Sequence, residues 1–345
     1  MKFSFIIIVV IVLVISVGVF LYFYDLPQKY TGLFIQDSSQ KYSGPMEKVT
    51  LTAYPDYAFS VYVAKEKGFF EKEGLDVNIK TFESGRLAMN SLENGEADIA
   101  TAADFVFVRD SFDRKDIRIF SVATISDNTH ELVARRDKGI ENILDIKGKK
   151  IGVTKKSSGE FYFGNLLIEN KLHLTDVELI DLKPSEMAIV LERGDIDAVV
   201  TWEPIVSKIK KNLGQEIVSF PAQGDQDVYF LLITRQEYID KSPEVLERFT
   251  RAMIKTEEFI KVHPLETEEF MRTKFNYDIE YIQLTWQKFK ISVELTQMLL
   301  LAMDNQARWI IANNLTGATE IPNYLDYIYT DALEKVKPEA ITIIK

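Results

Sequence analysis

Along most of the chain, apolar and polar residues alternate with two different periods, one typical of strands and the other of helices. The first group of regular elements begins near Lys48 and ends near Thr101. It is expected to contain a strand over 49–54, a helix over 59–73, a strand over 75–82, a helix over 86–93 and a strand over 97–101. Strands that alternate with helices favour a parallel sheet with helices on both faces.

The same order of elements recurs about a hundred residues further along the chain. This second group is expected to contain a strand over 150–154, a helix over 158–171, a strand over 177–182, a helix over 185–193 and a strand over 196–201. Segments 92–99 (LENGEADI) and 191–198 (LERGDIDA) also share a pattern, in which a helix ends at a glycine before a buried strand. The internal repeat predicts two similar α/β lobes, each a doubly wound βαβ unit.

Two strand-like segments are predicted to act as hinges between the lobes. They run from Leu132 to Arg135 and from Tyr229 to Ile233. Lobe 2 would therefore comprise residues 132–233, and lobe 1 would comprise residues 48–131 together with 234–345.

After Ser242 the pattern becomes helical. Helices are expected over 243–263, 265–275, 279–300 and 302–313. We expect this C-terminal region to pack on lobe 1, and the alternative is a separate helical domain.

The N-terminal segment is long and apolar. No charged residue occurs between Phe3 and Tyr24, a length close to the roughly 20 residues that cross a bilayer as a helix. We expect residues 1–24 to form a single-pass transmembrane anchor in the cell membrane, with residues 25–47 as a flexible linker and the body on the extracytoplasmic side. The alternative is a cleaved signal peptide that leaves a secreted or periplasmic protein.

Charge and cysteine content exclude several function classes. The formal net charge is −11, from 41 basic and 52 acidic residues, so the chain lacks the basic balance typical of nucleic-acid binding. Because cysteine is absent, the chain has no disulfide, no cysteine nucleophile, no thiolate metal site and no lipidated cysteine.

No enzyme signature is present in the sequence. The three histidines, His130, His173 and His263, lie far apart and do not match a metal-ligand spacing. There is no glycine-rich phosphate loop and no Gly-x-Ser-x-Gly motif. We therefore expect a binding protein without cofactor or metal.

Several motifs, in order, resemble a known family. They are YVAKEKGFF over 62–70 with EGLDV over 73–77, the helix–glycine–strand pattern LENGEADI over 92–99, IKGKKIGV over 146–153, and GDIDAV over 194–199 followed by Trp202-Glu203-Pro204. Together they resemble the nitrate/sulfonate/taurine group of ABC-transporter substrate-binding proteins, which also includes binders of a thiamine-pyrimidine precursor. The resemblance runs from about Val49 to the C-terminus.

The resemblance implies a type II periplasmic-binding fold that closes about its hinge on a small-molecule ligand. It also implies an ABC permease and an ATPase as partner subunits, and a monomer is expected. The favoured ligand is a small sulfonate-, nitrate- or taurine-like anion, and a pyrimidine or other N-heterocycle is the alternative. A membrane-anchored ligand sensor and an enzyme on the same scaffold are further alternatives.

Candidate ligand contacts lie in loops that follow the predicted strands, where ligands of such sheets bind. In lobe 1 they are Tyr54, Asp56, Tyr57, Ser84, Gly85, Arg86, Ala103, Asp104 and Phe105. In lobe 2 they are Thr154, Ser157, Ser158, Phe161, Tyr162, Thr201, Trp202 and Glu203. The crossing segments add Thr124, Asn128 and Tyr229.

These residues support two ligand chemistries. Ser157 and Glu160 fit a capping box at a helix start, and the free N–H groups of a helix start favour an anion. Arg86 could clamp an oxyanion or be a surface arginine. In contrast, the carboxylates Asp56, Asp104 and Glu203 favour a ligand with an amino or N–H group. The aromatic residues could stack on a ring or pack in the core.

Overall fold

The computed structural model describes residues 42–344, and Ser43–Lys345 form one compact unit. The predicted anchor over 1–24 and most of the predicted linker lie outside the described residues. Within residues 42–344, no helix is both long and apolar enough to cross a bilayer.

The larger lobe, lobe 1, is built on a six-stranded mixed sheet with the order β11-β4-β10-β3-β1-β2. Its strands are β1 (Glu47–Ala53), β2 (Leu75–Thr81), β3 (Ile99–Ala103), β4 (Ile117–Ser126), β10 (Val228–Arg235) and β11 (Phe289–Ile291). Strand β1 is parallel to β2 and β3, whereas β10 is antiparallel to both β3 and β4. Every residue of β3 is buried, as expected for a central strand covered on both faces.

The N-terminal helices of lobe 1 follow the sequence pattern with one break. They are α2 (Phe59–Glu66), α3 (Phe69–Lys72), α4 (Gly85–Glu93) and α5 (Asp104–Ser111). The single helix expected over 59–73 is divided at Gly68, whose φ of 66° lies in the left-handed region that glycine adopts without steric cost.

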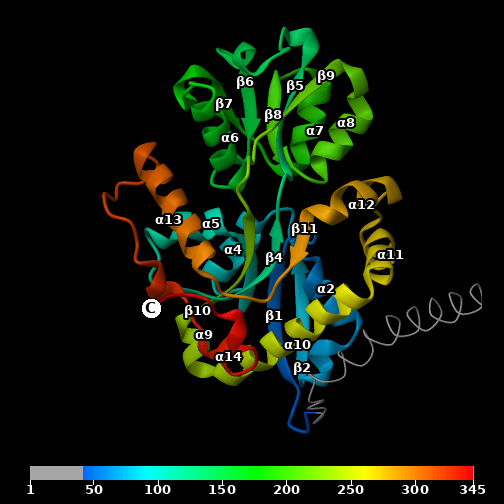
Figure 1. The fold of residues 1–345 in the computed structure, drawn as a ribbon, viewed down its shortest axis with the longest axis vertical. Helices are drawn as coiled ribbons and strands as arrows, with labels where there is room; N and C mark the ends of the chain where they lie inside the picture. The colour runs from blue at the N-terminus through cyan, green and yellow to red at the C-terminus, as the bar shows by residue number, and fades with distance from the viewer. Residues whose placement is uncertain (1–41, 345) are drawn as a thin grey trace, which may run out of the picture. The chain divides into compact units, whose positions relative to one another are not determined.

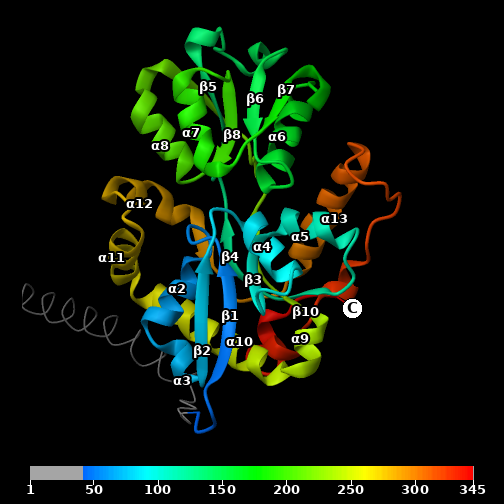
Figure 2. The ribbon, with the colours of Figure 1, turned by 180° about the vertical axis from the view of Figure 1, so that it is seen from behind.

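The C-terminal region also belongs to lobe 1 (Figure 1, Figure 2). Its helices are α9 (Gln236–Lys241), α10 (Pro243–Val262), α11 (Pro264–Phe275), α12 (Ile279–Thr285), α13 (Gln297–Ala312) and α14 (Asp331–Glu334). Helix α10 packs on α2 and α3, and the rings of Phe249 and Phe70 lie 4.7 Å apart. The predicted helix over 279–300 is wrong, because its middle forms β11, which pairs with the edge of β4.

Lobe 2 contains a five-stranded sheet with the order β7-β6-β8-β5-β9. Its strands are β5 (His130–Arg135), β6 (Lys150–Val153), β7 (Glu178–Asp181), β8 (Ala198–Trp202) and β9 (Ile217–Pro221). Its helices are α6 (Ser158–Glu169), α7 (Pro184–Arg193) and α8 (Ile205–Leu213). The first three strands of each repeat pair in the same way, the first strand being parallel to the other two.

The chain passes between the sheets in two short segments (Figure 1). The first lies between β4 and β5, and the second between β9 and β10. Neither predicted hinge segment lies at a crossing. Leu132–Arg135 lies within β5, which pairs with β8 and β9 of lobe 2, and Tyr229–Ile233 lies within β10, which pairs with β3 and β4 of lobe 1. The second crossing therefore lies nearer Ala222 than residue 233, and the sheet of lobe 2 ends at Pro221.

Aromatic side chains join the two lobes. Phe105 of α5 stacks on Phe161 of α6, with ring centroids 5.2 Å apart. Trp309 of α13 contacts Phe161 edge-on, with ring centroids 5.4 Å apart. All three side chains are buried, so the hydrophobic core continues from lobe 1 into lobe 2.

Candidate functional site

A small cavity lies between the lobes, near the ends of their central strands. Its volume is about 20 Å³, room for little more than one water molecule. It is lined by Tyr54, Tyr57, Ser84, Gly85, Arg86, Ala103, Val106, His130, Ser157, Ser158, Trp202 and Phe230. The lobes are therefore closed on each other, and a solute would enter only after they separate.

Nine of the residues selected from the sequence line this cavity. They are Tyr54, Tyr57, Ser84, Gly85, Arg86, Ala103, Ser157, Ser158 and Trp202. The other eleven selected residues are not among its lining: Asp56, Asp104, Phe105, Thr124, Asn128, Thr154, Phe161, Tyr162, Thr201, Glu203 and Tyr229. Sequence reasoning missed Val106, His130 and Phe230.

Two helices from opposite lobes begin at the cavity. Ser84 caps α4, and its Oγ accepts a hydrogen bond from Leu87 N at 3.3 Å. Ser157 caps α6, and its Oγ accepts from Gly159 N at 3.2 Å. Because free N–H groups and a partial positive charge gather at a helix start, the two ends together favour an anionic group.

The capping of α6 differs in detail from the expected capping box. The Glu160 carboxylate accepts a hydrogen bond from Lys156 N at 2.8 Å, one residue before the predicted donor. Glu160 is buried, and this contact holds its charge on the loop before the helix.

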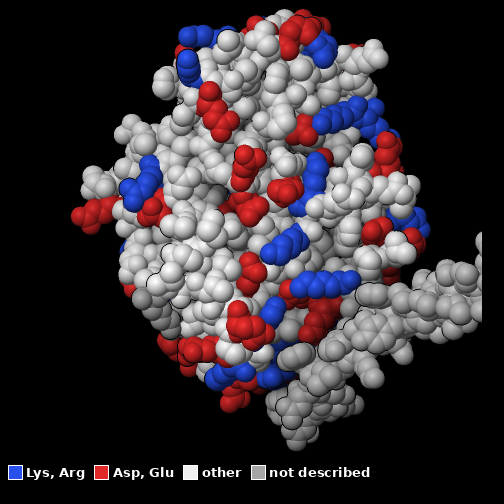
Figure 3. All heavy atoms as spheres, viewed as in Figure 1, with Lys and Arg blue, Asp and Glu red and all other residues white. Residues whose placement is uncertain are grey.

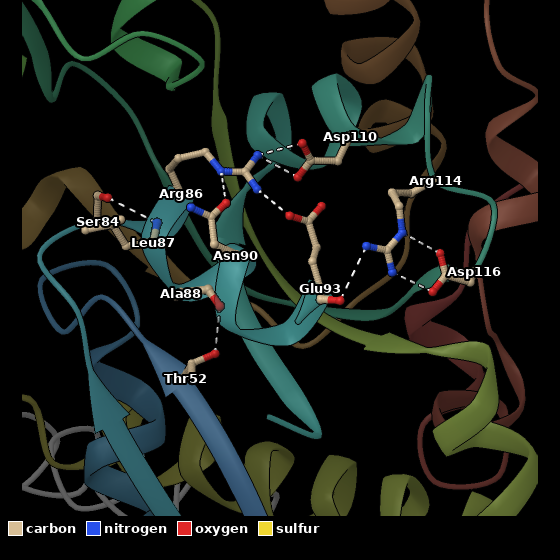
Figure 4. A network of polar contacts seen from close by, with 10 residues as sticks. All are labelled: Thr52, Ser84, Arg86, Leu87, Ala88, Asn90, Glu93, Asp110, Arg114 and Asp116. Atoms are coloured by element: carbon tan, nitrogen blue, oxygen red, sulfur yellow. Dashed lines mark hydrogen bonds and ion pairs between the residues drawn. The ribbon is translucent and has the colours of Figure 1, made fainter. Parts of the chain in front are cut away.

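Arg86 lines the cavity, but its guanidinium group is occupied by side chains of lobe 1 (Figure 4). Nη1 donates to both oxygens of Asp110 at 2.6 Å, Nη2 donates to Glu93 at 2.9 Å and Nε donates to Asn90 at 2.8 Å. These contacts use most of the five N–H donors of the guanidinium, so an oxyanion would compete with the two carboxylates for this group. Burial, followed by the nearby Asp110 charge, raises the pKa of Glu93 to about 7.

Aromatic side chains form one wall of the cavity. The Tyr57 ring stacks on Phe230 at 4.6 Å and on Tyr54 at 5.7 Å. Trp202 of lobe 2 closes this wall, because its Nε1 donates to the Tyr54 hydroxyl at 3.1 Å. The Tyr57 hydroxyl is buried beside the cavity, with the Thr129 side chain as a hydrogen-bonding neighbour.

The three candidate carboxylates lie behind the cavity wall. Burial raises the pKa of Asp56 to about 7 and that of Asp104 to about 7. Asp104 accepts a hydrogen bond from Gln306 of α13 at 2.8 Å. Glu203 lies 3.6 Å from Lys288 of lobe 1 and accepts from Ser207 N at 3.1 Å.

The remaining candidates lie outside the lining of the cavity. The Thr154 hydroxyl donates to Leu182 O at 2.8 Å, and the Tyr162 hydroxyl donates to Asp227 O at 3.0 Å. Asn128 is exposed in the first crossing with a φ of 45°. Thr124 and Tyr229 are buried on paired strands β4 and β10.

His130 is the most informative residue that the sequence did not reveal. It is the first residue of β5, and its Nε2 lies 2.8 Å from Ser158 Oγ. Burial lowers the pKa of His130 to about 3, so the ring is neutral at physiological pH. The one sequence feature that could have indicated a role for His130 in the site is its position directly after the polar segment 126–129.

Charge on the outer surface gives no further indication of the ligand. Figure 3 shows acidic and basic side chains interspersed over one face of the molecule. Within residues 42–344, no group of histidine, aspartate and glutamate side chains could hold a metal ion.

Several curated proteins similar to this chain are named as binding proteins. A putative binding protein of Brucella abortus is 29% identical over 63% of this chain and 69% of its own length. A putative aliphatic sulfonates-binding protein of Bacillus subtilis is 27% identical over 58% and 62%. The taurine-binding periplasmic protein of Escherichia coli is 26% identical over 59% and 63%.

Solved structures share the fold at low sequence identity. The alkanesulfonate-binding protein SsuA from Xanthomonas axonopodis, bound to MOPS, matches with a TM-score of 0.73 at 14% identity, over 84% of this chain and all of that one. The desulfurization enzyme DSZB matches with a TM-score of 0.59 at 14% identity, over 84% and 99%. The fold is thus found in a binding protein and in an enzyme. The family model described as NMT1/THI5 like matches residues 56–267, and this chain belongs to that family.

Proposed function

We propose that this chain is the extracytoplasmic solute-binding component of an ABC importer, and that it binds a small organic sulfonate or a related anion when its lobes close. The observation that carries the proposal is the convergence of the starts of α4 and α6, one from each lobe, on the same cavity. Relatives named for binding aliphatic sulfonates and taurine support the same ligand class.

The contacts proposed for the anion are the N–H groups at the starts of the two helices, next to Ser84, Gly85, Ser157 and Ser158. The buried Tyr57 hydroxyl would add a donor from lobe 1. In this proposal Arg86 acts indirectly, because its fork is bound to Asp110 and Glu93, and it orients the start of α4. The other selected residues would support the walls of the site.

A pyrimidine or other N-heterocycle is the second candidate ligand. It is favoured by the stacked wall of Tyr54, Tyr57 and Phe230, and by the absence of an unoccupied cationic side chain among the described lining residues. A flat ring could stack against the Tyr57 face once the lobes open.

A thermal-shift screen of the purified chain tests the ligand class. The panel would be taurine, ethanesulfonate, nitrate and a 4-amino-pyrimidine, each followed by titration calorimetry. We expect the sulfonates to raise the melting temperature. A rise with the pyrimidine alone would replace the first ligand class by the second.

The proposal includes an ABC permease and ATPase as partners and an anchor or signal segment that places the body outside the cytoplasm. It also states that the chain is a binding protein and not an enzyme. Mass spectrometry of the ligand after incubation with the protein checks this point. Recovery of the ligand unchanged is expected, and a chemically altered ligand would indicate an enzyme on this scaffold.

A further inference from the structure

A chain of buried polar groups connects the cavity to both crossing segments. It begins at Ser158 in the cavity wall, continues through His130, and ends at Thr129 and Gln223. All four residues are at most 7% exposed. Buried polar groups must find partners with matching donors and acceptors, so the direction of each hydrogen bond in this chain can be worked out.

Gln223 sets the direction at one end. Its Nε2 donates to Ser126 O at 2.8 Å and to Gln226 O at 2.7 Å. Its Oε1 accepts from Thr129 N at 2.9 Å. The reversed amide would place an oxygen against two carbonyl oxygens and an amide nitrogen against an N–H donor, so only one orientation is consistent with these contacts.

The orientation of Gln223 determines the tautomer of His130. Nδ1 lies 3.3 Å from Gln223 Oε1, which can only accept. A bare Nδ1 would oppose its lone pair to that oxygen, whereas a protonated Nδ1 donates to it. The Thr129 hydroxyl, 3.1 Å from the same Oε1, can donate there and accept from Nδ1 at 3.2 Å. The neutral ring therefore carries its proton on Nδ1 and has a bare Nε2.

The bare Nε2 in turn orients the hydroxyl of Ser158. At 2.8 Å it accepts the Ser158 proton, and this leaves the serine oxygen with only lone pairs to offer to the cavity. A serine hydroxyl can otherwise act as donor or acceptor by rotation. Here the buried chain removes that freedom.

We propose that His130 and Gln223 are positioning residues that hold the Ser158 hydroxyl as a hydrogen-bond acceptor at the ligand site, so that lobe 2 selects a ligand bearing an N–H or O–H donor. The inference rests on the proposed function, since it concerns the same site. Within that function, the starts of the helices take the anionic end of the ligand and Ser158 takes a donor on its remainder. The same contacts link the ligand to the two crossing segments, because Gln223 of the second crossing accepts a hydrogen bond from Thr129 N of the first.

The tautomer can be measured without a ligand. The full chain is labelled with ¹⁵N-histidine and examined by long-range ¹H–¹⁵N NMR at pH 7, where only three histidines contribute. His130→Gln identifies the signal, and His173→Gln at an exposed position is the matched control. We expect a pyrrole-type Nδ1 and a pyridine-type Nε2 for His130. A protonated Nε2, or an imidazolium at pH 7, overturns the proposal.

Two variants test the positioning roles. Ser158→Ala should keep the Nδ1–H tautomer and shift only the Nε2 resonance, because the hydroxyl is lost as a donor. Gln223→Leu should mix the two tautomers, provided that its circular dichroism spectrum matches that of the wild type. A tautomer unchanged in Gln223→Leu would overturn the role of Gln223, with Thr129 then sufficient to hold the ring.

Ligand titration tests the selectivity. Taurine carries an ammonium donor, whereas ethanesulfonate has the same sulfonate without one. Ser158→Ala should weaken taurine at least tenfold and ethanesulfonate less than about twofold, where tenfold corresponds to about 1.4 kcal/mol. Equal losses for both overturn the acceptor role. If neither sulfonate binds the wild type, the proposed function fails, and the NMR result alone then decides the positioning roles.

Discussion

Replacing Gly164 by alanine should force the lobes apart. Gly164 lies on α6 of lobe 2 and faces the Trp309 ring on α13 of lobe 1. A Cβ at Gly164 would lie 2.1 Å from Trp309 Cζ2, 2.7 Å from Cε2 and 2.9 Å from Nε1. Contacts below 3.0 Å do not occur at real Cβ atoms, so one of the two partners must move.

The magnitude follows from what surrounds the indole. An ordinary contact begins near 3.4 Å, so the ring must retreat by roughly 1.3 Å from its present 2.1 Å. Trp309 is 7% exposed and packs against Phe105 and Phe161, which leaves no free space behind it. Overpacking of this kind costs about 1–3 kcal/mol. Separation of the lobes relieves the clash, and a penalty of that size on the closed form shifts the closed-to-open ratio by about 5- to 150-fold.

The absence of native cysteine makes the assay direct. Cysteines are introduced at exposed Ile189 of lobe 2 and Leu265 of lobe 1, and the distance between two attached spin labels is measured by double electron–electron resonance. Gly164→Ala should enlarge the population with long distances. Adding Trp309→Leu, which removes the clashing ring atoms, should restore the short distance.

Two outcomes would refute this reasoning. An unchanged distance distribution in Gly164→Ala would mean that α13 absorbs the added methyl group within lobe 1. A long-distance population that persists in the double variant would mean that the clash with the indole is not its cause.

Three other changes have distinct expected outcomes. Native Asp104 keeps its proton to about pH 7, whereas the unfolded chain loses it near pH 4, so the free energy of unfolding should fall as pH rises through this range. Asp104→Asn should flatten this pH dependence in urea titrations made at each pH, and an unchanged pH dependence would contradict the burial argument. Arg86→Ala should lower the free energy of unfolding by about 3–5 kcal/mol, because it leaves buried carboxylates without their cation. Arg114 is more exposed, so Arg114→Ala should lower it by at most about 1 kcal/mol, and equal losses in chemical denaturation would show that burial is not decisive. Lys288→Met removes a cation of lobe 1 from buried Glu203 of lobe 2 and should increase the open population in the spin-label assay. A distance distribution that matches the labelled protein without this substitution would show that the ion pair does not keep the lobes together.

Much of the fold could be predicted from the sequence because its elements are strongly periodic. The repeat and the α/β alternation correctly indicated two βαβ lobes with a helical C-terminal region on lobe 1. Short elements were not predicted, and the reason is physical. Strand β11 exists only because β4 offers an unpaired edge, and a local apolar pattern does not reveal a distant partner strand. The location of β10 depended in the same way on its pairing with β3 and β4.

The candidate site was predictable where it follows strand ends and helix starts. Tyr54, Ser84 and Ser157 were selected on that basis and lie at the cavity. The occupancy of the Arg86 fork was not predictable, because Asp110 lies on a different helix, 24 residues further along the chain. The role of His130 depends on contacts that the fold alone brings together, and the wide separation of the three histidines in the sequence concealed it.

The way in which the chain enters and leaves lobe 2 bears on how such proteins diversify. Strands β5 and β9, the first and last of that lobe, are antiparallel neighbours, and Ala222 N donates to His130 O at 2.9 Å. Lobe 2 is therefore a contiguous insertion whose two ends meet at one point, the arrangement in which domain insertion and circular permutation are tolerated. Recombination at these two adjacent junctions would exchange all the cavity-lining residues of lobe 2 in a single step, and the sheet of lobe 1 would remain unbroken.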